Sequence, residues 1–85
     1  MLEFSYVIKD LIGLHARPAA QLVNLVKSVK STVIVEKQGK SVDARKLLAL
    51  MGLAITQGDE VNIRIEGEDE EEAKEMLEKF FEETL

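Results

Sequence analysis

Four stretches of the chain have the residue pattern of β-strands. From Leu2 to Ile8, apolar residues alternate with mostly polar ones, which predicts a strand with one buried face. A β-branched stretch is followed by a two-residue turn signal at 38–39 and a short returning stretch. Alternation resumes around Ile63. The predicted strands cover residues 2–9, 32–37, 40–43 and 60–66.

Three other stretches have the residue pattern of helices. After Ala16, apolar residues recur every three or four positions, and Pro18 falls in the first turn, where its missing N–H costs nothing. Residues 44–53 contain helix formers and predict a short helix that ends near Gly52. The glutamate-rich C-terminal stretch carries a complete apolar stripe, and Asp69 suits its N-cap position. We expect a solvated amphipathic helix there.

The predicted order of elements is β-α-β-β-α-β-α, without a repeat or a linker. Strands separated by helices in so short a chain favour an α+β domain, in which helices cover one face of an antiparallel sheet. Alternation within the strands agrees with one covered face and one solvated face. Because a chain of 85 residues buries one core at most, we expect residues 1–85 to form a single domain.

Composition and charge exclude several classes of function. The chain has no cysteine and one histidine, which excludes disulfides, thiol chemistry, a cysteine-ligated zinc and a multi-histidine metal site. We therefore expect no metal and no cofactor. Residues 66–85 hold ten acids against two lysines, a net charge of −8, whereas residues 1–65 hold six acids against nine basic residues, a net +3. Because a basic face and stacking aromatics are lacking, we expect no nucleic-acid partner.

No stretch predicts a signal peptide or a membrane span. The N-terminal residues have no basic region ahead of an apolar run. The longest apolar run, 47–55, is too short to cross a bilayer and is interrupted by Gly52. We expect a soluble cytoplasmic protein without membrane insertion.

The most informative segment for chemistry is Gly13-Leu14-His15-Ala16-Arg17-Pro18. It places the only histidine at the N-cap or in the first turn of a helix, where backbone amides have no partner inside the helix and the helix dipole is positive. Such an end binds anions, and phosphate above all. Because Pro18 has no N–H, the free amides are those of Ala16 and Arg17. The Arg17 guanidinium can also pair with phosphate oxygens.

A histidine near pH 7 is in part a neutral nucleophile, so this segment could accept a phosphoryl group and hold the resulting dianion. Phosphoryl transfer depends mostly on positioning and charge stabilisation, so no further catalytic side chain is required. The alternative is that His15 is an ordinary surface or capping residue. The residues alone leave the two interpretations about equally open.

A second feature is the apolar run Leu47-Leu48-Ala49-Leu50-Met51. A short helix cannot point all five side chains inward. The run therefore predicts either a helix buried on most sides or an exposed apolar patch that docks partners. In the second case Arg45 and Lys46 would give Leu47, Leu48 and Met51 a basic rim that attracts acidic surfaces.

With these features together, the whole chain resembles the histidine phosphocarrier family, HPr, of the bacterial phosphoenolpyruvate-dependent sugar phosphotransferase system. Residues 13–20 are similar to the family's active-site signature. Further similar positions are Gly39-Lys40, Leu53, Gly58 and Glu66-Gly67-Glu68-Asp69.

The resemblance implies an open-faced β-sandwich, with a four-stranded antiparallel sheet and three helices. It implies a stoichiometric carrier, not an enzyme with its own turnover. His15 would be phosphorylated on Nδ1 by Enzyme I and would pass the phosphoryl group to sugar-specific IIA domains. Arg17 would contact the phosphate, while Leu47, Leu48 and Met51 would belong to the docking surface of a monomer.

Three positions depart from the family pattern. Lys46 stands where many members carry a regulatory serine, so this chain lacks that acceptor for a serine kinase. Ile12 replaces a frequent serine or asparagine, and Ala54 stands where glycine is usual.

Two alternative functions remain at this point. The first is a phosphocarrier of a regulatory relay, nitrogen-related or linked to a dihydroxyacetone kinase. The second is a binding module that needs no phosphorylation and uses the patch at 47–51.

Overall fold

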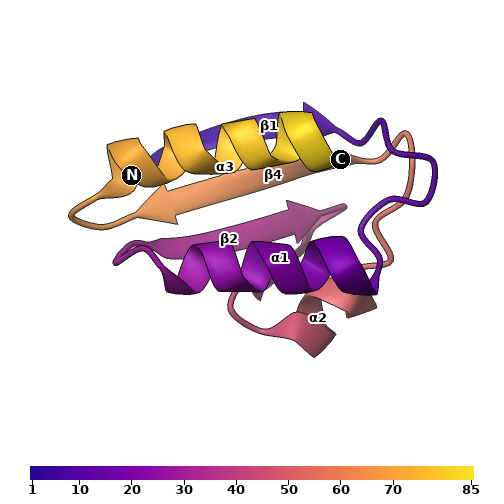
Figure 1. The fold of residues 1–85 in the computed structure, drawn as a ribbon, viewed down its shortest axis with the longest axis horizontal. Coiled ribbons are helices and arrows are strands. Elements are labelled where there is room, and N and C mark those ends of the chain that lie inside the picture. The colour runs from indigo at the N-terminus through magenta and orange to yellow at the C-terminus, as the bar shows by residue number, and fades with distance from the viewer.

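A computed structural model describes residues 1–85 as one open sheet with three helices (Figure 1). The order β-α-β-β-α-β-α agrees with the prediction. The elements are β1 (Leu2–Val7), α1 (Ala16–Lys27), β2 (Thr32–Lys37), β3 (Lys40–Asp43), α2 (Leu47–Gly52), β4 (Glu60–Glu66) and α3 (Glu70–Thr84).

The sheet has the strand order β1-β4-β2-β3, and every neighbouring pair is antiparallel. In Figure 1, α3 runs along β1 and β4, α1 runs along β2, and the shorter α2 lies next to α1. The opposite face of the sheet carries no helix. This arrangement confirms the predicted α+β open-faced sandwich.

The central strand β4 shows how the alternation of residues builds the core. Ile63 lies opposite Phe4 on β1 and Val35 on β2, and its side chain is fully buried. The next residue, Arg64, points to the uncovered face, since successive side chains of a strand point to opposite faces. Phe81 of α3 closes the core over β1, with ring centroids 5.6 Å from Tyr6 and 5.9 Å from Phe4 in edge-to-face geometry.

Two predicted boundaries are wrong, and backbone hydrogen bonds explain both. The strand predicted over 2–9 ends at Val7. The Ile8 amide still donates to Asp59, but the Ile8 carbonyl accepts the amide of Gly58 instead of that of Asp59, so the ladder stops there. The helix predicted from residue 44 begins at Leu47. The carboxylate of Asp43 accepts the Arg45 amide at 2.9 Å, so a turn separates β3 from α2.

The predicted N-cap position of Asp69 is confirmed, but its carboxylate bonds to another segment. Asp69 occupies the N-cap position of α3, but its side chain makes no bond to that helix. Its carboxylate accepts the amides of Lys30 and Ser31, both at 2.9 Å, and the Ser31 hydroxyl at 2.5 Å. These donors, the Lys30 amide foremost, lower the pKa of Asp69. Asp69 therefore ties the start of α3 to the loop between α1 and β2.

None of the three helices combines the length and the apolar character that a membrane-spanning helix needs.

Candidate functional site

His15 lies exposed at the N-cap position of α1. Its backbone is extended, with φ of −94° and ψ of −170°, and its carbonyl accepts the Ala19 amide at 2.9 Å. Its side chain makes no capping hydrogen bond. The imidazole is therefore free for chemistry, and the structure does not support a capping role for this side chain.

The first amides of α1 point out of the helix beside His15. Those of Ala16 and Arg17 donate no hydrogen bond within the protein, and Pro18 has no N–H to donate. Ala16 and Arg17 are exposed, and Arg17 forms no ion pair. The imidazole, the two free amides and the unpaired Arg17 side chain thus come from three consecutive residues at the positive end of a helix dipole.

The loop that leads into His15 is held by its own residues. The Asp10 carboxylate accepts the amides of Ile12 and Gly13 at 3.1 and 3.0 Å. Sequence reasoning missed Asp10, although an aspartate three residues before a glycine is a turn signal that could have shown it. Together these bonds fix the turn immediately before the helix.

A second loop supports the first from behind. The Leu14 amide donates to the carbonyl of Ile55 at 3.0 Å, and both side chains are buried. Gly13 has a φ of 81°, and a Cβ added there would lie 2.5 Å from the same carbonyl oxygen. In Figure 1 the β1–α1 and α2–β4 loops run side by side at the end where α1 begins. No local pattern indicates this support, because it joins segments about forty residues apart.

The apolar run after Lys46 is exposed on one side. Leu48 is 82% exposed, Leu47 and Met51 are 37% and 39% exposed, and only Leu50 of α2 is buried. The helix is therefore not buried on most sides, and the predicted surface patch exists.

Two basic residues precede this patch in the chain. Arg45 and Lys46 are both exposed at the start of α2, and α2 lies against α1. Leu11 and Ile12, 79% and 64% exposed in the loop before His15, add apolar surface that sequence reasoning missed.

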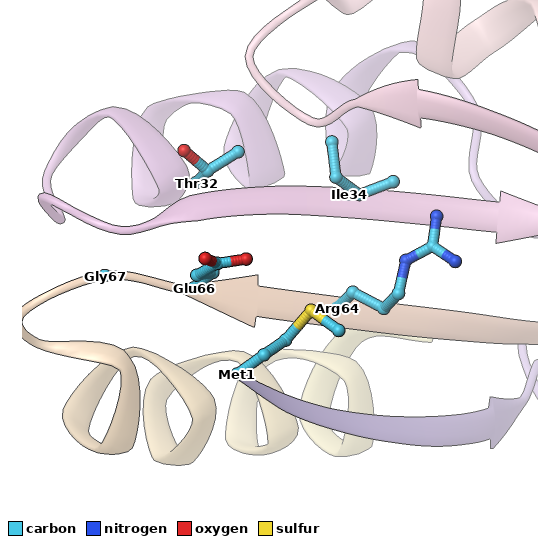
Figure 2. A pocket seen from close by; sticks show the side chains of 6 residues that line it. All are labelled: Met1, Thr32, Ile34, Arg64, Glu66 and Gly67. Atoms are coloured by element: carbon cyan, nitrogen blue, oxygen red, sulfur yellow. The ribbon is translucent and has the colours of Figure 1, made fainter.

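A hollow on the uncovered face of the sheet is a poor alternative site for an anion. Figure 2 shows its lining between β2 and β4, with Met1 at one side. Its one arginine, Arg64, already donates to the Glu36 carboxylate and the Ser41 hydroxyl, both at 3.1 Å. Glu66 adds a further negative charge. No group of residues resembles a metal site either.

Comparison with known proteins identifies the family. A family model described as "PTS HPr component phosphorylation site" matches residues 2–83. A phosphocarrier protein HPr from Xylella fastidiosa is 37% identical over 82 residues, 96% of this chain and 92% of the relative. The chain therefore belongs to the HPr family of phosphocarriers of the phosphotransferase system.

The relatives are of two kinds. The HPr-like protein Crh of Bacillus subtilis is 45% identical over 85 residues, the full length of both chains. The crystal structure of an HPr from Thermoanaerobacter tengcongensis matches with a TM-score of 0.92 at 41% identity, covering 96% of this chain and 92% of that one. A crystal structure of Bacillus subtilis Crh, described as a domain-swapped dimer, matches with a TM-score of 0.78 at 39% identity, covering 100% and 98%.

Proposed function

We propose that this protein accepts a phosphoryl group from Enzyme I on His15 and passes it to sugar-specific IIA domains in the cytoplasm. Residues 1–85 would act as one HPr-like domain. The observation that carries the proposal is the exposed imidazole of His15 beside the free amides of Ala16 and Arg17.

The chemistry follows from these groups. The lone pair of the neutral imidazole, at Nδ1 in this proposal, attacks phosphorus while the bond between phosphorus and the donor breaks. The phosphoryl oxygens then meet the free amides and the Arg17 guanidinium, which stabilise the dianion. Transfer onward reverses the step, because a nucleophile of the acceptor attacks phosphorus and the imidazole leaves. The protein ends unchanged and acts as a stoichiometric carrier with a phosphohistidine intermediate.

Docking of both partners is assigned to the patch formed by Leu47, Leu48 and Met51. Apolar side chains exposed together provide contact area, and Arg45 and Lys46 supply a basic rim that steers acidic partners. We propose a monomer as the working form. Dimers are described for Crh and for another structure of the Thermoanaerobacter HPr, so light scattering at working concentration tests this part directly.

Incubation with Enzyme I and phosphoenolpyruvate tests the function. The protein should take up phosphate that is labile in acid and stable in base, and His15→Ala should fold normally and take up none. Acid-labile phosphate retained on His15→Ala would contradict the assignment of His15 as the phosphorylated residue.

The similarity to Crh, whose solution structure is described as that of a "Catabolite Repression HPr", favours a second candidate, a regulatory relative that binds partners through the same patch. It predicts partner binding without phosphate uptake. The two candidates therefore separate in the same incubation. Uptake of phosphate without transfer to any sugar IIA domain would instead favour a regulatory relay.

A further inference from the structure

Lys37, near the end of β2, has a partly buried side chain with three acceptors. Its side chain is only 14% exposed. The ammonium donates to the carbonyls of Leu53 and Ala54, at 3.1 and 2.8 Å, and lies 2.9 Å from a carboxylate oxygen of Asp59. All three N–H donors of the ammonium therefore have an acceptor in the α2–β4 loop.

Asp59 ties the other half of this loop to the same point. Its carboxylate accepts the Thr56 amide at 2.8 Å and the Thr56 hydroxyl at 3.3 Å. The hydrogen bond from Lys37, followed by that from the Thr56 amide, lowers the pKa of Asp59, so the carboxylate is charged at neutral pH. We call Lys37 and Asp59, with the backbone of 53–56 that they hold, the loop clamp.

The clamp holds a strained backbone conformation at Ala54. Ala54 has a φ of 52°, in the left-handed region that residues with a Cβ rarely adopt. Its own carbonyl and that of the preceding residue are the two that Lys37 contacts. The ammonium therefore favours a backbone conformation that alanine alone disfavours.

The next residue connects the clamp to the candidate site. The carbonyl of Ile55 accepts the Leu14 amide, one residue before His15, and Gly13 lies directly against the same oxygen. A change in the φ and ψ of Ala54 would shift the chain that follows it, including this oxygen, and would release the loop that carries His15.

We propose that Lys37 and Asp59 are positioning residues for phosphoryl transfer: by fixing the Ile55 carbonyl, they hold His15 in line with the free amides of α1. This inference rests on the proposed function, since it assigns the clamp to the same site. Neither residue touches the phosphate. Their effect passes through the Leu14 hydrogen bond, which can be observed without any transfer.

The test compares Lys37→Met and Asp59→Asn with Lys74→Met as a matched control. The Lys74→Met substitution also removes one ion pair, to Glu78 at 3.2 Å, but Lys74 lies on α3 away from both loops. The first readout is hydrogen exchange of the Leu14 amide, referred to the amide of Ile63 in the central strand. In both clamp variants, Leu14 should exchange about ten-fold faster relative to Ile63, as expected when a hydrogen bond to a charged group is lost. The control should not change this ratio.

The second readout is the rate of phosphoryl transfer from Enzyme I. Lys37→Met should slow it about ten-fold, and the loss should shrink in a background that carries Ala54→Gly, since glycine adopts the left-handed conformation without strain. A merely structural ion pair would lower global stability without this coupling to residue 54.

The outcomes separate the two claims. If the wild-type protein takes up no phosphate, the proposed function fails, and the Leu14 ratio still decides whether the clamp holds the loop. If the wild type takes up phosphate and Lys37→Met transfers it at the same rate, the positioning role is overturned. The positioning role is also overturned if the exchange ratio of Leu14 to Ile63 is unchanged in both clamp variants. The same holds if Lys37→Met slows transfer equally with Ala54 and with glycine at position 54.

Discussion

Substitution of Gly13 tests how tightly the two loops at the candidate site fit. Gly13 has a φ of 81°, and a Cβ there would lie 2.5 Å from the Ile55 carbonyl oxygen and 2.7 Å from the Thr56 Cα. Ordinary contacts of a Cβ lie at 3.4–4 Å, and here both obstacles are backbone atoms. Gly13→Ala must therefore separate the loops and disturb the hydrogen bond from Leu14 to Ile55, 3.0 Å long in the native protein.

The expected loss of stability in Gly13→Ala has two parts. A left-handed conformation costs a residue with a Cβ about 1–2 kcal/mol. Forcing extra volume into a packed region costs about 1–3 kcal/mol more. We expect Gly13→Ala to lower the free energy of unfolding by about 2–5 kcal/mol, a large part of the stability of so small a protein.

Gly39 provides a control that isolates the first part. It has nearly the same φ, 82°, but no heavy atom lies within 4 Å of an added Cβ. Gly39→Ala should therefore cost only about 1–2 kcal/mol. Urea unfolding followed by circular dichroism measures both variants, at an unchanged dependence on urea. Equal losses for the two variants would refute the close fit of the loops.

Three further changes test the electrostatics of the molecule. Arg17→Ala should slow phosphoryl transfer by about ten-fold to a hundred-fold with little loss of stability, as expected for one charge-assisted contact; an unchanged rate would show that the amides suffice. Lys46→Glu should slow transfer from Enzyme I at low salt and less at high salt, because salt screens the electrostatic attraction between the partners. Transfer rates equal to those of the wild type at every ionic strength would show that Lys46 has no part in docking. The pKa of Asp69 is lower in the folded protein than in the unfolded chain, so its charged carboxylate stabilises the fold at pH values above the unfolded pKa. This stabilisation is lost as the pH falls through the folded pKa. The urea midpoint of Asp69→Asn should therefore be lower than that of the wild type at neutral pH and fall less between about pH 5 and about pH 2, and parallel pH profiles would contradict the role of this carboxylate.

Local patterns predicted those parts of the fold that local interactions determine. Alternation around Ile63 placed β4 correctly, because a strand with one buried face leaves a period of two in the sequence. Pro18 marked the first turn of α1 and so predicted His15 at the N-cap or in the first turn, and the structure has it at the N-cap. The candidate site could be predicted for the same reason, since its imidazole, amides and guanidinium lie within three consecutive residues.

The remaining features depend on tertiary contacts. Asp69 has the residue type of an N-cap, but two amides and a hydroxyl from a loop 38 and 39 residues away compete for its carboxylate. The clamp residues Lys37 and Asp59 look like ordinary surface charges in the sequence, because only the paired loops bring them together. Leu11 and Ile12 were missed for a related reason: a loop carries no periodicity that shows which side chains are exposed.

The most direct test of the central claim is to locate the phosphoryl group itself. The protein is incubated with Enzyme I and phosphoenolpyruvate, kept at alkaline pH to preserve phosphohistidine, and sequenced by electron-transfer tandem mass spectrometry. We expect a single phosphoryl group, on His15. A phosphoryl group on any other residue, or none in a preparation whose Enzyme I phosphorylates a known HPr, would contradict it.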